Sequence, residues 1–450
     1  MDESEGWKWV PWETEKDKDD STPTVLIEAE AIINSCASNA ASIGVAPPVA
    51  ATFSPSASTG IALPSHVTAQ HVLAVINKHL DVKDQEALEV ILATAIAINF
   101  PGDPSWLHVV APPGGGKTEI LRAFNGSRVE SRDTITPQTL ISGLKAAQGK
   151  ADLLPKLNKK LLIIKDFGSL LSLHQQKQRD IFADLRVAYD GELKKTFGSG
   201  VDKGYKATFG LITGATDAID RFYLIHAQLG ERFLRINLQG DNDKAIARAL
   251  ESSDGGEAMR QELSAIMRAF LDSSGEWVDA NKYLEQQHIE GLKALAQVTA
   301  WLRSPVARDR HRSIVYKPHP EVGTRLVKQL KRLIIGLANI RGTICTTHQD
   351  YFTTRRVALS TVPQYRFDIV DVLQAAEALK PGQELTAQAI GGFAEMSNTV
   401  VREQIEDLYE LRAVTRTGQV SYTWRLTDKV HDLLKKASVN ASAEQIQRQR

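Results

Sequence analysis

The sequence predicts an α/β protein built on a mainly parallel sheet, followed by helices and a small C-terminal domain. Short apolar strands and amphipathic helices alternate from about residue 106 to 238. A glycine-rich loop joins the first strand to a helix, and a late stretch shows two helices and then a hairpin. The 450 residues, 42% hydrophobic and 24% charged, are typical of a soluble globular chain with several domains.

Composition and periodicity change four times along the chain. They predict an arm that is acidic and then Ala/Ser/Pro-rich, an α/β core, a helical lid region, a small C-terminal domain and a flexible tail, at residues 1–65, 66–240, 241–364, 365–436 and 437–450. Trp7, Trp9 and Trp12 stand among acidic residues of the arm. They form either a docking motif for a protein partner or an unstructured tail with incidental aromatic residues.

Composition also limits the partners and the compartment. Cys36 and Cys345 have no His or Cys at ligand spacing, so neither a disulfide framework nor structural zinc is expected. The longest apolar run, 87–100, is too short for a membrane span, and the acidic N-terminus differs from a signal peptide. We therefore expect a cytoplasmic protein without a membrane partner. The formal net charge is zero, so only local clusters can indicate nucleic acid.

The strand WLHVV is followed by APPGGGKTEILRAF, a phosphate-binding loop with Ala111 in the first glycine position. The loop glycines let backbone N–H groups turn around phosphates, Lys117 reaches the β and γ oxygens, and the Thr118 hydroxyl binds magnesium. The predicted nucleotide contacts are Pro113, Gly114, Gly115, Gly116, Lys117, Thr118 and Glu119. ATP and Mg²⁺ are therefore the expected cofactors.

Two further strands end in polar residues. KLNKKLLIIKDFG places Asp166 at the carboxyl end of a strand, where a magnesium-orienting carboxylate is needed. ATFGLITGATDAI ends in polar Thr213, Thr216 and Asp217, a position that suits a side chain, Thr216 first, that contacts the γ-phosphate or positions the attacking water. LGERFLRINL places Arg232 before a final apolar strand. This arginine either reaches a neighbouring subunit's γ-phosphate or forms an ion pair with Glu231.

In this order and spacing the four elements resemble the AAA+ ATPases, which are P-loop NTPases. APPGGGKT is similar to Walker A, LLIIKDF to Walker B, LITGATD to sensor 1 and LGERF to the arginine-finger box. The resemblance implies a lid with a second sensor arginine, for which Arg325 is the better candidate and Arg341 the alternative. It also implies a homo-oligomer, a ring or spiral such as a hexamer. The general layout is similar to ATPases of prophages and other mobile elements.

The resemblance has one departure. In most relatives a glutamate follows the Walker B aspartate and polarises the attacking water, whereas this chain has Phe167. General-base help contributes about 10²–10⁴-fold, so its loss would leave nucleotide binding intact and hydrolysis slow. Either Glu119 or Glu192 replaces that carboxylate in space, or the chain is a slow ATPase in which ATP acts mainly as an assembly switch.

The segment QRDIFADLRVAYDGELKKTFGSGVDKGYKATFGL is distantly similar to the presensor hairpin of minichromosome-maintenance helicases and of bacterial enhancer-binding activators. Its lysines either grip a phosphate backbone or form a solvated basic turn; they are Lys194, Lys195, Lys203 and Lys206. The same alternatives, phosphate contact or a solvated loop, apply to the basic cluster RSPVARDRHRSIVYK.

The stretch from Glu384 to Asp428 predicts helix, turn, helix and a two-stranded wing, with Thr386 and Ser397 as helix N-caps. It resembles a winged helix-turn-helix domain, whose second helix enters the DNA major groove. The residues expected to meet DNA are Asn398, Thr399 and Arg402 on that helix and Arg416 and Arg425 on the wing. The same helix carries acidic residues that oppose DNA, namely Glu403, Glu406 and Asp407, and such domains also serve protein contacts.

These features predict an ATP-hydrolysing oligomer that acts on DNA, in replication or mobile-element DNA processing, as a helicase-like motor. The alternative is an ATP-switched loader, or a transposition or transcription regulator, that assembles on DNA with little hydrolysis. A polymerase-factor activator is disfavoured, because the hairpin lacks the aromatic-glycine signature of those activators.

Overall fold

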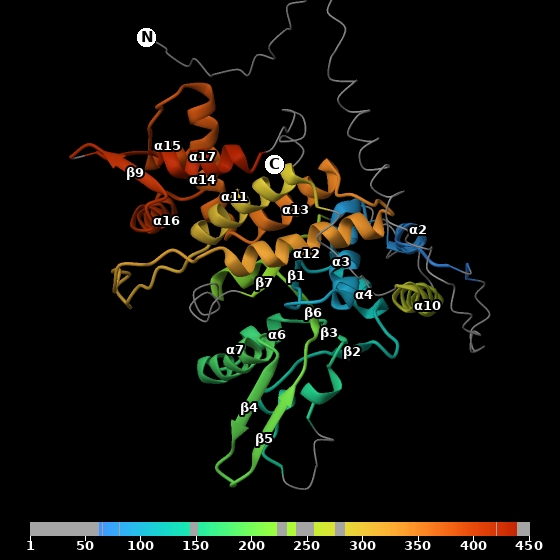
Figure 1. Ribbon diagram of the computed structural model, residues 1–450. Helices are drawn as coiled ribbons and strands as arrows, with labels where there is room; N and C mark the ends of the chain where they lie inside the picture. Colours follow the sequence, from blue (N-terminus) through green and yellow to red (C-terminus); the bar gives the residue numbers. More distant parts are fainter. Residues whose placement is uncertain are drawn as a thin grey trace, which may run out of the picture. The chain divides into compact units, whose positions relative to one another are not determined.

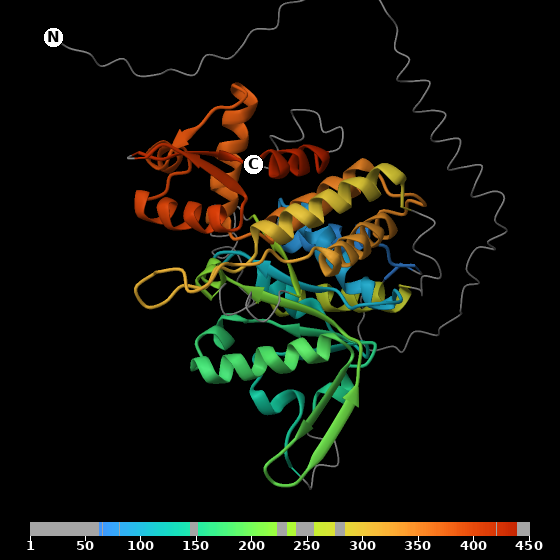
Figure 2. The same cartoon turned by 60° about the vertical axis from the view of Figure 1, so that its left-hand side comes forward.

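The computed structural model describes residues 63–64, 66–80, 82–144, 152–222, 232–239, 256–274, 284–419 and 421–438. Residues 1–62 and 65 of the predicted arm, residues 439–450 of the predicted tail, and Glu231 lie outside these residues. Figures 1 and 2 show how the elements are arranged. Among the described residues, no helix has the length and apolar character needed to cross a membrane.

Five strands of the described part form one parallel sheet in the order β2-β3-β6-β1-β7. They are β1 (Trp106–Val110), β2 (Val129–Arg132), β3 (Leu161–Ile164), β6 (Gly210–Ala215) and β7 (Phe233–Asn237). The three central strands β1, β3 and β6 are buried throughout, as expected when helices cover both faces. The chain passes from β1 to the far edge and returns through β3 and β6. The carboxyl end of β1 is therefore the switch point, where open α/β sheets bind ligands.

Alternate side chains of the strands enter two separate cores. Leu107 and Val109 of β1 belong to one core, and Trp106 and Val110 to the other. The first core continues into the C-terminal helices described below, and its other helices are α2 (Ala69–Leu80), α3 (Gln85–Ile96), α4 (Lys117–Ala123), α10 (Glu257–Ser273), α11 (Gln286–Leu302), α12 (Thr324–Ile340) and α13 (His348–Ser360). The helices of the second are α5 (Pro137–Leu140), α6 (Gly168–Leu171) and α7 (Gln175–Tyr189). The described ranges also contain the short 3₁₀ helices η1 (Ala97–Asn99), η2 (Leu154–Lys156) and η3 (Asp217–Phe222).

A two-stranded antiparallel hairpin follows α7 and projects from the sheet, as Figure 1 shows. It consists of β4 (Glu192–Thr196) and β5 (Asp202–Lys206). Alternate residues face opposite ways: Leu193 is buried, whereas Lys194 is exposed. The hairpin stands where the sequence resembles a presensor hairpin.

The C-terminal region contains α14 (Gln364–Leu379), α15 (Ala387–Phe393), α16 (Asn398–Glu410) and α17 (Asp428–Lys436), with the short strands β8 (Leu385–Thr386), β9 (Val414–Thr417) and β10 (Thr423–Leu426). These strands pair antiparallel in the order β8-β10-β9, so β8 joins the two expected strands. The predicted N-caps are confirmed, because Thr386 accepts from the Ala389 amide and Ser397 from the Val400 amide. The predicted apolar face of α16 is buried: Val401, Ile405 and Leu408.

Candidate nucleotide site

The loop after β1 has a backbone shape suited to phosphate. Gly114 and Gly116 have φ angles of 83° and 76°, in the left-handed region that favours glycine. The Ala111 amide donates to the Ala215 carbonyl at 3.2 Å, which joins the start of the loop to the end of β6. Because α4 begins at Lys117, the amides of its first turn adjoin the loop, and the Glu119 amide donates to the Gly116 carbonyl at 3.1 Å.

The Lys117 side chain folds back over this loop. Its Nζ donates to the carbonyl oxygens of Ala111 at 3.2 Å and Pro112 at 3.3 Å. Burial lowers the pKa of the Lys117 ammonium, while the negative charges of Asp166 and Asp217 act in the opposite direction. The ammonium group is therefore close to carboxylates that follow two different strands.

Three predicted residues stand at the carboxyl edge of the sheet. Asp166 follows β3, Thr216 follows β6, and Lys117 begins the helix after the β1 loop. The Oδ1 atom of Asp166 accepts the Gly168 amide at 3.0 Å, which fixes the carboxylate at the strand end. Asp217, which follows Thr216 directly, stands at the same edge, and its side chain is 73% exposed. The ammonium of Lys117, the carboxylates of Asp166 and Asp217 and the hydroxyl of Thr216 thus stand at the carboxyl edge of the sheet, near the switch point.

The predicted magnesium ligands suit that ion. Thr118 supplies a hydroxyl and Asp166 a carboxylate, both hard oxygen ligands, and both residues are exposed. No group of three or more His, Cys, Asp or Glu residues that could hold a metal occurs in the described ranges. Mg²⁺ at nucleotide sites needs no such group, because phosphates and water complete its coordination.

Phe167 belongs to the hydrophobic core. It is completely buried in the core beneath the sheet, and its ring centre lies 4.8 Å from that of His108 and 5.9 Å from those of Phe182 and Phe233. Its amide donates to the Gly214 carbonyl at 2.7 Å. A carboxylate in this conformation would be buried among aromatic rings rather than directed at a phosphate.

Glu119 is engaged in ion pairs. Its Oε1 accepts from Arg122 at 2.8 Å, and its Oε2 accepts the Arg260 Nε at 3.0 Å. Arg260 comes from α10, 141 residues away, and the sequence analysis did not find it. Sequence position alone gave no signal for it, because only the packing of α10 on α4 brings the two together. Arg260 is therefore a cation close to the loop of its own chain.

Glu192 does not reach this site. It begins β4 directly after Gly191, whose carbonyl accepts the amide of Ala207 at 3.0 Å, just before β6 starts. Glu192 therefore lies at the amino edge of the sheet, opposite the loop. Its carboxylate pairs with Lys194 at 2.9 Å, which lowers its pKa. The expectation that Glu192 replaces the missing glutamate in its own chain is wrong.

Arg232 also lies at the amino edge. It immediately precedes β7, whose first residue Phe233 is level with Trp106 at the start of β1. Its guanidinium donates to Asp190 at 3.4 Å and lies 5.5 Å from the ring centre of Tyr189. Burial and the nearby charge of Arg325 lower the pKa of Arg232. Five strand residues span about 16 Å, so Arg232 is too far from its own phosphate loop to contact a nucleotide there.

The expected second sensor has a different position as well. Arg325 is the second residue of α12, and Gln329 one turn later donates to the Arg232 carbonyl at 2.5 Å. Arg325 therefore lies beside Arg232, and the expectation that it contacts the nucleotide of its own chain is corrected. The alternative, Arg341, is held by Glu89 and, at 2.6 Å, by Asp350.

The structure separates the hairpin lysines into two groups. Lys194 and Lys206 lie on the exposed face, whereas Lys195 pairs with Asp184 at 2.7 Å and Lys203 with buried Asp152 at 2.8 Å. Lys194 is 74% exposed although it pairs with Glu192. Lys195 and Lys203 instead hold the hairpin against the body of the protein.

Asp152 is the anchor of this hairpin and gives a pH prediction. Burial alone would raise its pKa, but hydrogen bonds from Lys203, Ser142 and Tyr205 outweigh burial and lower the pKa to about 2. A depressed folded-state pKa contributes stability above the ordinary value of 3.8, and this contribution is lost as pH falls toward 2. Asp152→Asn should cost about 1–3 kcal/mol at pH 7. Urea unfolding should show the difference from wild type shrinking between pH 4 and 2.

The matched control is Asp133→Asn. Asp133 is 85% exposed and pairs with Lys165 at 2.7 Å, so its loss should change the free energy of unfolding little. A pH-independent difference between wild type and Asp152→Asn would contradict the anchoring role.

The predicted DNA contacts of the C-terminal region differ in their surroundings. Asn398, Thr399 and Arg402 are exposed on α16. The Arg416 guanidinium lies 4.7 Å from the ring centre of Tyr409 and 4.6 Å from that of Tyr422. Arg425 pairs with exposed Asp428 at 2.9 Å.

Comparisons with known proteins found no matching family model and no matching curated protein. Among solved structures, the chain is similar to the apo A form of the NrS-1 C-terminal region, with 12% identity over 81% of this chain and 76% of that one, at a TM-score of 0.29. It is also similar to the Aeropyrum pernix ORC2 protein in ADPNP–ADP complexes, with 13% identity over 84% and 97%, at a TM-score of 0.20. The function proposed below therefore depends on the geometry of this chain.

Proposed function

We propose that this protein is an AAA+-type ATPase that works as an oligomer on DNA, in replication or mobile-element DNA processing. One observation carries the proposal: Lys117 follows the glycine loop at the switch point of a parallel sheet, and Asp166 and Asp217 follow β3 and β6 at the same carboxyl edge. A cation, an anion-binding loop and a metal-binding carboxylate are the elements that phosphoryl transfer needs. Pro113, Gly114, Gly115, Gly116 and Lys117 hold the phosphates of ATP, and Thr118 and Asp166 hold Mg²⁺.

DNA binding is proposed for two exposed surfaces. The helices α15 and α16 with the β9-β10 pair have the order of a winged helix-turn-helix domain, and α16 exposes Asn398, Thr399 and Arg402. The hairpin exposes Lys194 as a second phosphate contact. The C-terminal region lies against α11 and α13, because Lys429 lies 4.6 Å from the ring centre of Trp301 in α11 and Tyr351 of α13 donates to the Ala437 carbonyl at 3.0 Å. ATP-driven movement of the core would therefore reach the DNA-binding helix.

Asp217 is the carboxylate that we assign to the attacking water. Phe167 is buried, Glu119 is paired with two arginines, and Glu192 is at the wrong edge. Asp217 is exposed, its ion pair with Arg235 is long at 3.9 Å, and it acts electrostatically on Lys117. Asp217→Asn should therefore lower ATP turnover by about 10²–10⁴-fold while leaving ATP binding intact. Glu119→Gln is the matched control and should keep turnover within a few-fold of wild type.

Turnover should be measured with and without duplex DNA, because the two candidate functions differ there. A motor requires turnover that DNA stimulates. Slow turnover that neither DNA nor Asp217→Asn changes would instead support the alternative, an ATP-switched loader or regulator, which the burial of Phe167 favours.

A further inference from the structure

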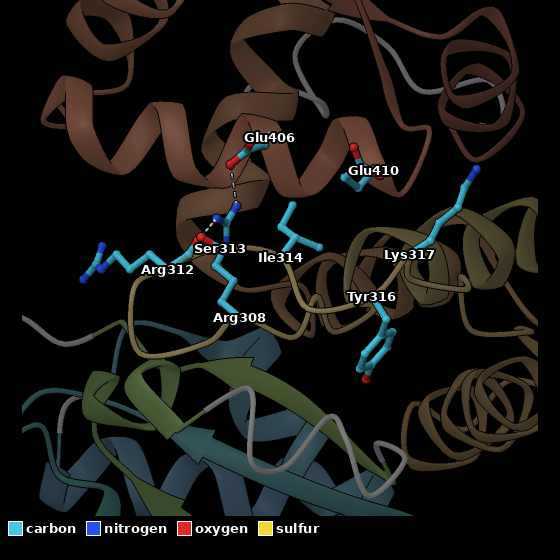
Figure 3. A pocket seen from close by; sticks show the side chains of 8 residues that line it. All are labelled: Arg308, Arg312, Ser313, Ile314, Tyr316, Lys317, Glu406 and Glu410. Carbon is cyan, nitrogen blue, oxygen red and sulfur yellow. Dashed lines mark hydrogen bonds and ion pairs between the residues drawn. The ribbon is translucent and has the colours of Figure 1, made fainter.

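The connection between α11 and α12 folds back over the helix proposed to bind DNA. This arginine loop, residues 303–323, is closed by an antiparallel bridge between Arg308 and Ile314. Figure 3 shows the cavity of about 500 Å³ between the loop and α16. Its lining residues include Arg308, Arg312 and Lys317 from the loop and Glu406 and Glu410 from α16.

The arginines of the loop pair with the acids of α16. Arg308 donates from Nε and Nη2 to Asp407 Oδ1 at 2.9 and 2.6 Å, and from Nη2 to Glu406 at 3.0 Å. Arg312 forms an ion pair with Glu403. Arg366 of α14, itself buried, donates to the other Asp407 oxygen at 2.9 Å. The three acids that oppose DNA in the sequence are therefore each engaged by a guanidinium.

These acids adjoin the outward face of α16. Glu403 follows Arg402 directly. Glu406 is four residues after Arg402, one helical turn along the same side of α16. A phosphate held by Arg402 would lie within a Debye length, about 8–10 Å, of both carboxylates. Unpaired, the two carboxylates would repel DNA from this face.

We propose that Arg308 and Arg312 mask the acids of α16 and thereby make its Asn398–Thr399–Arg402 face competent to bind duplex DNA. The inference rests on the proposed DNA binding by α16. The arginine loop then affects DNA binding indirectly, because it neutralises carboxylates of α16 and does not itself contact the DNA. The two arginines are thus positioning residues.

The test begins with Arg312→Ala. The Arg312 side chain is 70% exposed and Glu403 is 24% exposed, so the substitution frees the carboxylate without opening the core. Duplex DNA affinity should fall about 3–10-fold at low salt. The double variant Arg312→Ala/Glu403→Gln should recover to within about twofold of wild type, because no charge then needs masking. Arg310→Ala, an exposed arginine of the same loop, should have a smaller effect.

Titrations at two salt concentrations separate masking from direct contact. If Arg312 contacts a phosphate, the double variant stays weak and its salt slope falls by about one, which overturns masking. Equal losses in Arg310→Ala and Arg312→Ala, or no loss in Arg312→Ala, also overturn it. If the wild type shows no salt-dependent binding, or if Arg402→Ala binds as wild type, the proposed DNA-binding face itself fails, and masking fails with it.

Discussion

Lys117→Ala is expected to weaken ATP binding by roughly 10–100-fold in the presence of Mg²⁺. The physical reason is the loss of charge-assisted hydrogen bonds to phosphate oxygens, each worth about 1.5–3 kcal/mol in a partly buried setting. The ammonium is partly desolvated, as the lowered pKa of Lys117 indicates, so a phosphate can replace its two loop carbonyls at little cost. Titration with a fluorescent ATP analogue measures the effect.

The matched control is Lys380→Ala, which removes an exposed lysine outside the site. This variant should bind nucleotide as the wild type does. The carbonyls that Lys117 contacts belong to its own loop, so its loss should leave the unfolding temperature nearly unchanged. Unchanged ATP affinity in a folded Lys117→Ala protein would contradict the assignment of this loop and Lys117 as the phosphate-binding site.

The strands that were predictable are those with continuous apolar runs. β1, β3 and β6 are buried on both faces, and their sequences contain few polar residues. β2 was missed because it is an edge strand of the sheet in which only Val129 is buried, while Glu130 and Arg132 are partly buried and Ser131 is exposed. An isolated four-residue stretch of this kind has no apolar signal and forms by pairing with β3.

The site was predictable where function follows from local sequence. The glycine loop fixes its own conformation, and the strand ends fix the edge at which Asp166 and Thr216 stand. The positions of Arg325 and Arg260 depend instead on which end of their helix packs over which edge of the sheet. The sequence gives the helix and its apolar face, but the direction in which α12 crosses the sheet is set by tertiary packing. The error at Arg325 and the omission of Arg260 have this common cause.

Arg232→Ala is expected to lower ATP turnover by about 10³-fold with little change in ATP affinity, the lower end of the range for an arginine supplied in trans. Arg232 lies at the amino edge and its own loop at the carboxyl edge, so it completes the site of a neighbour or none. Its pairing with Asp190 is long, at 3.4 Å, and that carboxylate is 61% exposed, but the Arg232 side chain is only 8% exposed, so the guanidinium has to move outward to reach a neighbour's phosphate. Asp190→Asn is the control and should retain turnover, because the arginine remains.

A mixing experiment tests the trans assignment directly. Lys117→Ala and Arg232→Ala proteins are each inactive, but in a mixed head-to-tail assembly an intact loop of one can meet the intact arginine of the other. Random equimolar mixing completes about a quarter of the interfaces, so turnover should recover to about a quarter of wild type. If Arg232 acts on the nucleotide of its own chain, or only stabilises the fold through its contact with Tyr189, turnover would not recover at any ratio. In that case no subunit of the mixture holds both Lys117 and Arg232. Recovery that requires both variants places Arg232 across a subunit boundary. Replacing Arg232→Ala by Arg325→Ala in the same mixture then tests whether Arg325, at the same edge of the sheet, also acts on the neighbouring subunit.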